Sequence, residues 1–277
     1  MVVLDKSILL IGESDVGKSH YGAQLLKRLM QEDGRIRMHG APTNLQPFEA
    51  VMARLDAGLS ADHTATSVYH ESHWPIVDDQ GRNAHLIWPD YGGEQVKNII
   101  DGRQLPHAWL TRIADSSAWL LMIRLQTTRA NDDVFTRPLT SLKENSKESR
   151  DGRLSDQTRL IELLQILLYA HSTSNKRSGQ LPRFVVLLTC WDEMESSGIP
   201  IDLLHERLPM FADFVASNWK DYSVLGLSAL GRSLDKENPD EDYIAQGSER
   251  FGYVILDDAT PSPDLTLPIL KLLAGST

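Results

Sequence analysis

One octapeptide near the start of the chain, G-E-S-D-V-G-K-S at residues 12–19, constrains the fold more than any other stretch. It follows an apolar run at residues 7–11, which we expect to be a buried strand, and precedes apolar residues at helical spacing up to about Asp33. A phosphate-binding loop requires this strand–loop–helix context. The loop glycines allow backbone N–H groups to surround a phosphate chain, and the helix N-terminus adds positive potential. The sequence therefore predicts nucleotide binding.

Two residues of the octapeptide have specific predicted roles. Lys18 would reach the terminal phosphates, and the Ser19 hydroxyl would bind a magnesium ion. The other residues predicted to bind nucleotide here are Gly12, Glu13, Ser14, Asp15, Val16, Gly17 and His20.

Composition excludes several classes of function. The formal charge of −10 leaves no basic excess with which to neutralise nucleic-acid phosphates. Cys190 is the single cysteine, so no intramolecular disulfide can form, which fits a reducing compartment. No apolar run approaches the length of a membrane span, and Asp5 and Lys6 interrupt the early apolar stretch, so we expect no signal peptide. These features predict a cytoplasmic protein, and its oligomeric state stays open.

The remaining chain alternates strand and helix patterns. Predicted strands lie at residues 118–123, 184–188, 222–227 and 253–256, and a hairpin at 68–77 and 84–88 surrounds the turn 78–83. Predicted helices include 48–55, a stretch interrupted near Pro106, a leucine-rich helix capped by Ser155, 201–219 and 264–273. Polar stretches at about 127–153 and 233–250 are interpreted as insertions. We expect one α/β domain over residues 1–277, whose mostly parallel sheet has one reversed edge where the hairpin lies.

Three further motifs occur in the order found in Ras-like GTPases. Asp90-x-x-Gly93 resembles their second phosphate motif, Thr189-Cys190-Trp191-Asp192 resembles the guanine-reading [N/T]-K-x-D motif, and Ser228-Ala229-Leu230 resembles the S-A-x motif that supports the base. The resemblance implies a three-layer phosphate-loop NTPase that binds GTP or GDP with Mg²⁺. It also implies that Asp90 holds the metal through water and that the Gly93 N–H meets the γ-phosphate.

Shorter strings suggest a narrower resemblance. T-C-W-D-E at residues 189–193, and G-Y-V-I at 252–255 followed by D-L-T-L-P at 264–268, resemble bacterial double-GTPase proteins. Those proteins are associated with predicted conflict and defence gene clusters.

The base-reading motif departs from the family pattern. Cys190 stands where the family has a lysine whose aliphatic stem covers the base. Trp191 either stacks on the base instead or packs in the core. Asp192 can accept hydrogen bonds from guanine N1–H and the exocyclic amine, which adenine does not offer, or it is a turn residue at a strand end. Guanine preference therefore depends mainly on Asp192.

The residues next to the second phosphate motif leave hydrolysis open. Glu94 occupies the position at which Ras-like proteins use glutamine to orient the attacking water, and Gln95 follows it. A carboxylate there is repelled by the γ-phosphate unless it is protonated or paired, which predicts weak hydrolysis that awaits a partner. Alternatively Gln95 takes the role, or both residues are an exposed helix start.

Other assignments follow from the resemblance. Thr66 is the expected magnesium-binding threonine of the first mobile loop, with Thr64 in reserve. Asp15 either stabilises the loop or stands in for an asparagine that helps to bind a catalytic potassium ion. Three arginines in or beside the first insertion are either solvated or candidates for an arginine finger: Arg124, Arg129 and Arg137.

The sequence as a whole predicts a GTP-binding molecular switch that hydrolyses GTP slowly and is stimulated by a protein partner. That partner would be an effector, an activator or a second GTPase. Two alternatives remain: a nucleotide-binding interaction module that does not hydrolyse, suggested by Glu94, and an ATPase, suggested by Cys190.

Overall fold

The computed structural model describes residues 7–61, 70–91, 93–128, 155–174, 180–194 and 198–274. Its centre is a six-stranded sheet of order β1-β5-β6-β7-β8-β9. The parallel strands are β1 (Ser7–Ile11), β5 (Ser116–Ile123), β6 (Arg183–Thr189) and β7 (Tyr222–Ser228). β8 (Tyr253–Ile255) runs antiparallel to β7, and β9 (Pro261–Ser262) runs antiparallel to β8. This confirms the predicted α/β class, a mostly parallel sheet with one antiparallel edge.

The predicted hairpin is confirmed, but it lies elsewhere than we expected. β3 (His70–Asp78) and β4 (Asn83–Asp90) pair with each other, and β2 (Ile36–Met38) pairs with the other side of β3. The three strands form a separate sheet, with β4 beside β1. The turn is fixed by Asp78, whose Oδ1 accepts the N–H groups of Gln80 and Arg82. The reversed edge of the main sheet is therefore formed by β8 and β9 and not by the hairpin.

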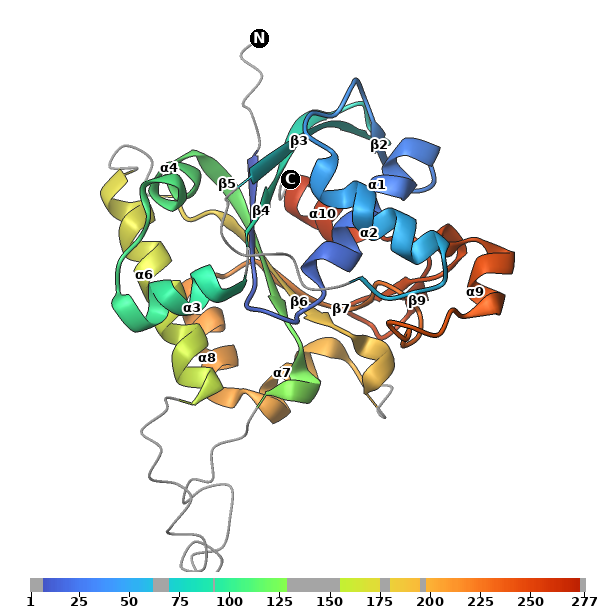
Figure 1. Ribbon diagram of the computed structural model, residues 1–277. Helices are drawn as coiled ribbons and strands as arrows, with labels where there is room; N and C mark the ends of the chain where they lie inside the picture. The colour runs from blue at the N-terminus through green and yellow to red at the C-terminus, as the bar shows by residue number, and fades with distance from the viewer. Residues whose placement is uncertain are drawn as a thin grey trace, which may run out of the picture.

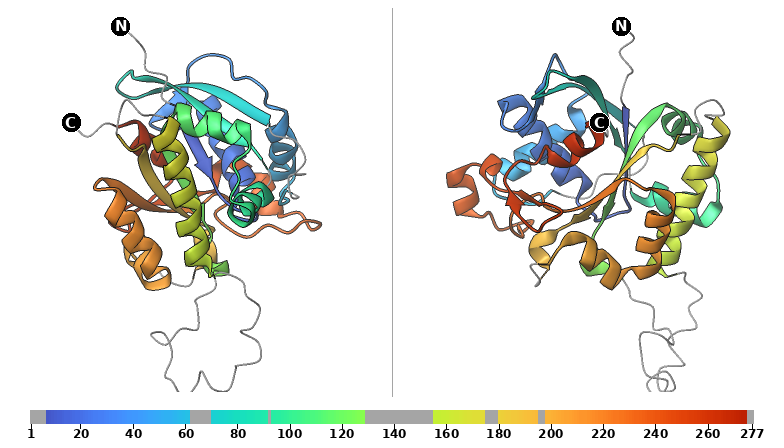
Figure 2. Two further views of the ribbon diagram at one scale, coloured as in Figure 1. Left: turned by 90° about the vertical axis from the view of Figure 1, so that its left-hand side faces the viewer. Right: turned by 180° about the vertical axis from the view of Figure 1, so that it is seen from behind.

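Helices cover both faces of the main sheet, as Figures 1 and 2 show. One face carries α3 (Gly93–Gly102), α4 (His107–Asp115), α6 (Asp156–Ser174), α7 (Pro200–Arg207) and α8 (Pro209–Asn218). The other carries α1 (Lys18–Gln31) and α10 (Leu267–Leu273), with α2 (Gln46–Asp56) packed against α1. In β1, Leu9 and Ile11 face the first core while Ile8 and Leu10 face the second. Burial on both faces explains the unbroken apolar runs of the parallel strands.

Two predicted segments differ from the structure. The helix expected at 201–219 is two helices, because Pro209 disfavours helical backbone at the preceding residue and Leu208 adopts φ −136°. The stretch 233–250 is more than a polar insertion: it contains α9 (Glu241–Gln246) and a 3₁₀ turn at Ser248–Arg250. Its Tyr243 is fully buried in a small core shared with α1 and α2. The first insertion lies outside the described residues except for 127 and 128.

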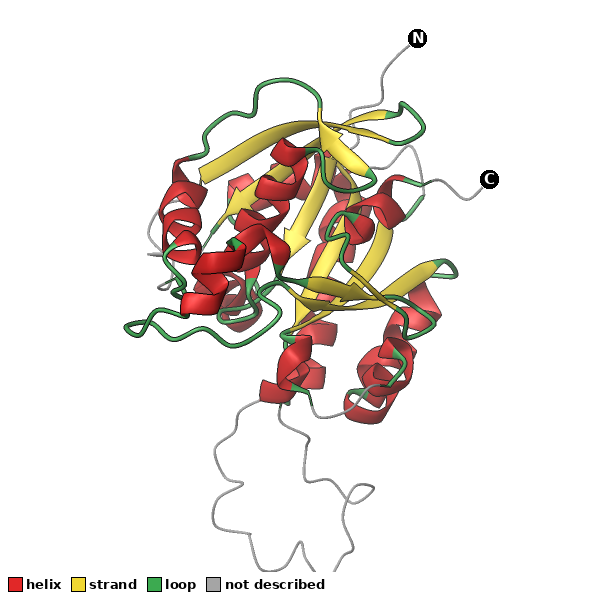
Figure 3. Ribbon diagram, turned by 90° about the vertical axis from the view of Figure 1, so that its right-hand side faces the viewer, coloured by secondary structure: helices red, strands yellow, loops and turns green. Residues whose placement is uncertain are grey.

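The topology brings four chain segments to one edge of the sheet. The loop 12–17, Arg124, the segment 190–194 and the segment 229–232 directly follow β1, β5, β6 and β7. Because these strands are parallel and adjacent, their carboxyl ends meet, which is where open α/β sheets bind ligands (Figure 3). Within the described ranges, no helix has the length and apolar character needed to cross a lipid bilayer.

Candidate nucleotide-binding site

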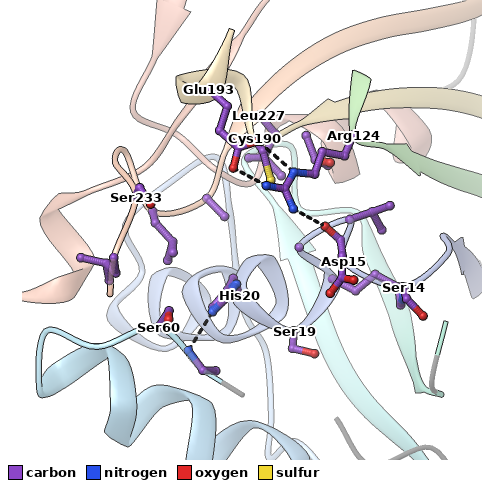
Figure 4. A pocket seen from close by; sticks show the side chains of 18 of the residues that line it. Ser14, Asp15, Ser19, His20, Ser60, Arg124, Cys190, Glu193, Leu227 and Ser233 are labelled. Atoms are coloured by element: carbon purple, nitrogen blue, oxygen red, sulfur yellow. Dashed lines mark hydrogen bonds and ion pairs between the residues drawn. The ribbon is translucent and has the colours of Figure 1, made fainter. Parts of the chain in front are cut away.

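A cavity of about 800 Å³ opens at the carboxyl ends of these strands (Figure 4). Its size is typical of small-ligand sites. Most of the residues that the sequence predicts to bind nucleotide or to take part in hydrolysis line it: Ser14, Asp15, Val16, Gly17, Lys18, Ser19, His20, Gly93, Glu94, Thr189, Cys190, Asp192, Ala229 and Leu230. Residues from four separate parts of the chain thus converge on one space.

The octapeptide forms a tight loop before α1. Gly17 has φ 77°, a left-handed conformation that glycine adopts without strain, and it is the N-cap of the helix. The Lys18 Nζ donates hydrogen bonds to the carbonyl oxygens of Gly12 (2.9 Å) and Glu13 (2.5 Å). The ammonium group is therefore held within the loop, where the loop N–H groups and the α1 N-terminus would attract phosphate.

A buried tyrosine, Tyr91, links this loop to β1 through two hydrogen bonds. Tyr91 Oη accepts the N–H of Gly12 and donates to the carbonyl of Leu10, each at 3.0 Å. Burial raises the pKa of Tyr91, so its hydroxyl keeps the proton that it donates. Sequence reasoning missed this residue, although its place directly after Asp90 was a usable signal.

Gly93 is pressed against the loop backbone at the start of α3. A Cβ at this position would lie 1.9 Å from the Ser14 nitrogen and 2.2 Å from the Glu13 carbonyl carbon. Only a glycine fits there, so the second phosphate motif and the phosphate loop form one packed unit.

The side chain of Glu13 is directed to a neighbouring helix. Its Oε1 pairs with Arg159 Nη2 of α6 at 2.6 Å, and both side chains are half-buried. Glu13 therefore contributes to the phosphate loop through its backbone, and Arg159 is a supporting residue that the sequence analysis missed.

Asp192 and the buried Ser228 are brought together, as the base-reading hypothesis requires. Ser228 Oγ donates to Asp192 Oδ1 at 2.5 Å and accepts the N–H of Gly231 at 2.9 Å. Trp191 is buried and packs on Gly226, where a Cβ would lie 2.4 Å from the indole ring. Trp191 is therefore a core residue, whereas Asp192 and Glu193 of the same turn line the cavity.

Arg124 and Cys190 lie between the octapeptide loop and the 3₁₀ turn Trp191–Glu193. Arg124 forms a two-pronged ion pair with Glu193, Nε to Oε2 at 2.8 Å and Nη2 to Oε1 at 2.6 Å, and its Nη1 donates to the Asp15 carbonyl at 3.2 Å. The hydrogen bonds with Glu193 raise the pKa of Arg124, so it stays charged. Burial raises the pKa of the Cys190 thiol to about 11, so this residue is neutral. Arg129 and Arg137 lie outside the described residues.

The side chains of Glu94 and Gln95, the two candidates for positioning the attacking water, contact different surroundings. Glu94 is exposed and lines the cavity. Gln95, one helical position further, accepts a hydrogen bond from the Trp109 indole at 3.3 Å. Of this pair, Glu94 is therefore the residue beside the phosphate loop.

His20 connects α1 to the segment that leads towards Thr64 and Thr66. Its Nε2 accepts the N–H of Ala61 at 3.0 Å, and burial lowers the pKa of His20 to about 4, so the ring is neutral. Thr64 and Thr66 lie outside the described residues, as does the side chain of Asp90, whose backbone ends β4.

Comparisons with known proteins extend this description. The profile of the Double-GTPase 1 family matches residues 9–272. No curated protein is significantly similar to this chain in sequence. Similar solved structures include the signal recognition particle receptor SRb-GTP/SRX complex from Chaetomium thermophilum, with 14% identity over 87% of this chain and 96% of that chain and a TM-score of 0.38. Another is Roco2 RocCORdC of Methanosarcina barkeri bound to GDP, with 16% identity over 80% of this chain and 43% of that chain and a TM-score of 0.29.

Proposed function

The chain belongs to the Double-GTPase 1 family, and from this premise we propose that it is a GTP-binding switch with slow, partner-stimulated hydrolysis. The observation that carries the proposal is the convergence of four motifs on one cavity. The phosphate loop, Gly93 and the Asp192–Ser228 pair supply groups for the phosphates at one end and for the base at the other. The protein partner would be an effector, an activator or a second GTPase.

The phosphate end needs positioning and charge neutralisation rather than covalent chemistry. Lys18 is already held inside the loop and would exchange its two carbonyl contacts for phosphate oxygens. The hydroxyl of Ser19 at the start of α1 lines the cavity, and it suits a magnesium ion together with Asp90 and Thr66. When bound, Mg²⁺ would neutralise charge on the phosphates.

Switching would depend on Gly93 and on the segment after Ala61. The Gly93 backbone lies against the phosphate loop, so a γ-phosphate bound there would alter the contact between α3 and the loop. The hydrogen bond between His20 and Ala61 anchors the start of the second segment to α1. Ordering of both segments by the γ-phosphate and their release after hydrolysis is a recurring switch mechanism.

Slow hydrolysis follows from Glu94. Its carboxylate is exposed at the cavity, and a γ-phosphate beside it would repel it. The same observation favours a second candidate function, a nucleotide-loaded interaction module that does not hydrolyse. Phosphate release in a single turnover separates the two, since the module would release none.

The relative affinities for guanine, xanthine and adenine nucleotides test the proposal directly. They also decide whether the protein is an ATPase instead. Asp192→Asn would place an NH₂ donor against the donors of guanine, while xanthine offers a carbonyl there. We expect roughly ten- to hundredfold weaker GTP binding and improved XTP binding, with ATP poor throughout. Competition binding of GTP, XTP and ATP to wild type and variant measures this. Wild-type preference for ATP, or unaltered GTP affinity in the variant, would remove the support for guanine recognition.

A further inference from the structure

We propose that Arg124 supplies the flat surface on which the nucleobase stacks. It would thereby cover the face of the base, which the short side chain of Cys190 cannot do. This assignment rests on the proposed binding of a guanine nucleotide and adds to it a second residue of the base site. Asp192 would read the edge of the base, and Arg124 would cover its face.

The position of Arg124 follows from the sheet order. Arg124 directly follows β5, which lies between β1 and β6, so it emerges between the phosphate loop and the turn that carries Asp192. Its guanidinium reaches both neighbours, the Asp15 carbonyl on one side and Glu193 on the other (Figure 4). A nucleotide that spans from the loop to Asp192 must pass beside this group.

The hydrogen bonds of Arg124 hold the guanidinium by its edge. Nε, Nη1 and Nη2 all donate, and donors of a planar guanidinium lie in its plane. The two faces of the plane carry none of these bonds. The side chain lines the cavity and is 27% exposed, so part of it is accessible to a ligand there. A guanidinium fixed in this way stacks on aromatic rings and loses little freedom in doing so.

The partner of Arg124 ties it to base recognition. Glu193 and Asp192 are consecutive residues of one 3₁₀ turn, Trp191–Glu193. The backbone of this one turn therefore positions both carboxylates: Glu193, which holds the guanidinium, and Asp192, which would read the base edge. A base bound to Asp192 is brought next to the guanidinium without any movement of the turn.

Other described residues that line the cavity are less suited to this role. Cys190 ends in a neutral thiol after one carbon, which covers little of a purine ring. Tyr91 is buried beneath the phosphate loop, with its hydroxyl bound to Gly12. Arg232 lies over the Phe251 ring at 4.7 Å and pairs with Asp240, so one of its faces is already occupied.

The test compares a nucleotide with a ligand that has phosphates and no base. GDP and inorganic tripolyphosphate are titrated by calorimetry into wild type, into Arg124→Lys, and into a double variant with Arg124→Ala and Glu193→Ala. The double variant removes the ion pair without changing the net charge, and Arg124→Lys keeps the charge but not the plane. We expect GDP to bind about ten- to hundredfold more weakly to the double variant, the usual effect of losing one stacking partner. Arg124→Lys should weaken GDP by a smaller factor, because a lysine stem can still cover part of a base. Both variants should bind tripolyphosphate within about twofold of wild type.

A third ligand separates stacking from edge recognition. IDP lacks the 2-amino group of guanine but has the same ring face, so loss of stacking weakens GDP and IDP by the same factor. An unchanged ratio of GDP to IDP affinity in the Arg124 variants supports stacking, whereas a changed ratio would assign Arg124 to the base edge and overturn the proposal.

Two other results would also overturn the proposal. If the affinities for GDP and tripolyphosphate fell equally, Arg124 would only stabilise the phosphate loop. Unaltered GDP affinity in the variants would show that Arg124 does not contact the base. Arg124→Lys, which keeps a cation beside Glu193, gives an answer if the double variant fails to fold by circular dichroism. A wild-type protein that binds tripolyphosphate as tightly as GDP would contradict the proposed function itself, and this outcome is visible before any variant is made.

Discussion

Substitution of Gly93 by alanine tests the packed unit formed by α3 and the phosphate loop. The added Cβ would lie 1.9 Å from the Ser14 nitrogen, whereas an ordinary contact needs at least 3.4 Å. The neighbours are backbone atoms of Glu13 and Ser14, so no side chain can rotate away. The helix and the loop must therefore separate by roughly 1.5 Å, and overpacking of this kind costs about 1–3 kcal/mol of unfolding free energy.

The same displacement should weaken GTP more than GDP. If the Gly93 N–H donates to the γ-phosphate, a shift of about 1.5 Å takes a normal hydrogen bond of about 2.9 Å beyond its useful range. A hydrogen bond to a charged group contributes about 1.5–3 kcal/mol, so the ratio of GTP to GDP affinity should fall roughly ten- to hundredfold.

Gly102→Ala is the matched control, because it lies at the other end of α3 and a Cβ there meets nothing within 4 Å. Urea unfolding measures stability, and calorimetric titration with GTP and GDP measures affinity. The control should retain wild-type affinities and unfold at the same or a higher urea concentration, since alanine favours helix over glycine. A Gly93→Ala protein with wild-type stability and an unaltered affinity ratio would refute the packing argument and the contact with the γ-phosphate.

Three further substitutions have defined outcomes. Lys18→Ala should abolish GTP binding in calorimetry. It should lower the unfolding free energy by only about 1–2 kcal/mol, because the ammonium makes two hydrogen bonds in the loop. Wild-type GTP affinity in this variant would refute the phosphate-loop assignment. Glu94→Gln should raise the single-turnover hydrolysis rate without tightening GTP binding. Gln95→Ala should not lower that rate, since Gln95 is hydrogen-bonded to Trp109. Loss of hydrolysis in Gln95→Ala would instead assign the water-positioning role to Gln95. His20 has a folded pKa of about 4, below its ordinary 6.5, so the stability it contributes is present above pH 6.5 and is lost as the pH falls towards 4. Urea unfolding of the nucleotide-free protein at pH 7.5 and 4.5 should show wild type losing about 2–3 kcal/mol more than His20→Gln, and equal losses would contradict a neutral, buried His20.

Much of the site could be predicted because its motifs are local in the chain. The octapeptide needs only a strand before it and a helix after it, and the structure has both. The carboxyl ends of β6 and β7 could be placed beside the loop because parallel strands in an α/β sheet end at a common edge. Asp192 and Ser228 therefore meet, although 36 residues separate them.

Two of the differences between the predicted and the observed structure have a signal in the sequence itself. Pro209 ends one helix and begins another, as the backbone restriction before a proline requires. Tyr243 lies within the stretch interpreted as a polar insertion, and its ring packs with Leu234 against α1 and α2.

The sequence by itself determined the phosphate loop, the order of the motifs and the class of fold, because each depends on neighbours along the chain or on burial patterns within one element. The tertiary structure decided which side chains share the cavity. Arg124 and Glu193 are 69 residues apart, and Tyr91 and Gly12 are 79 apart, so only the folded chain pairs them. Glu94 and Gln95 are adjacent, but consecutive residues of a helix point in directions about 100° apart. The way α3 packs on the loop therefore places one at the cavity and the other against Trp109.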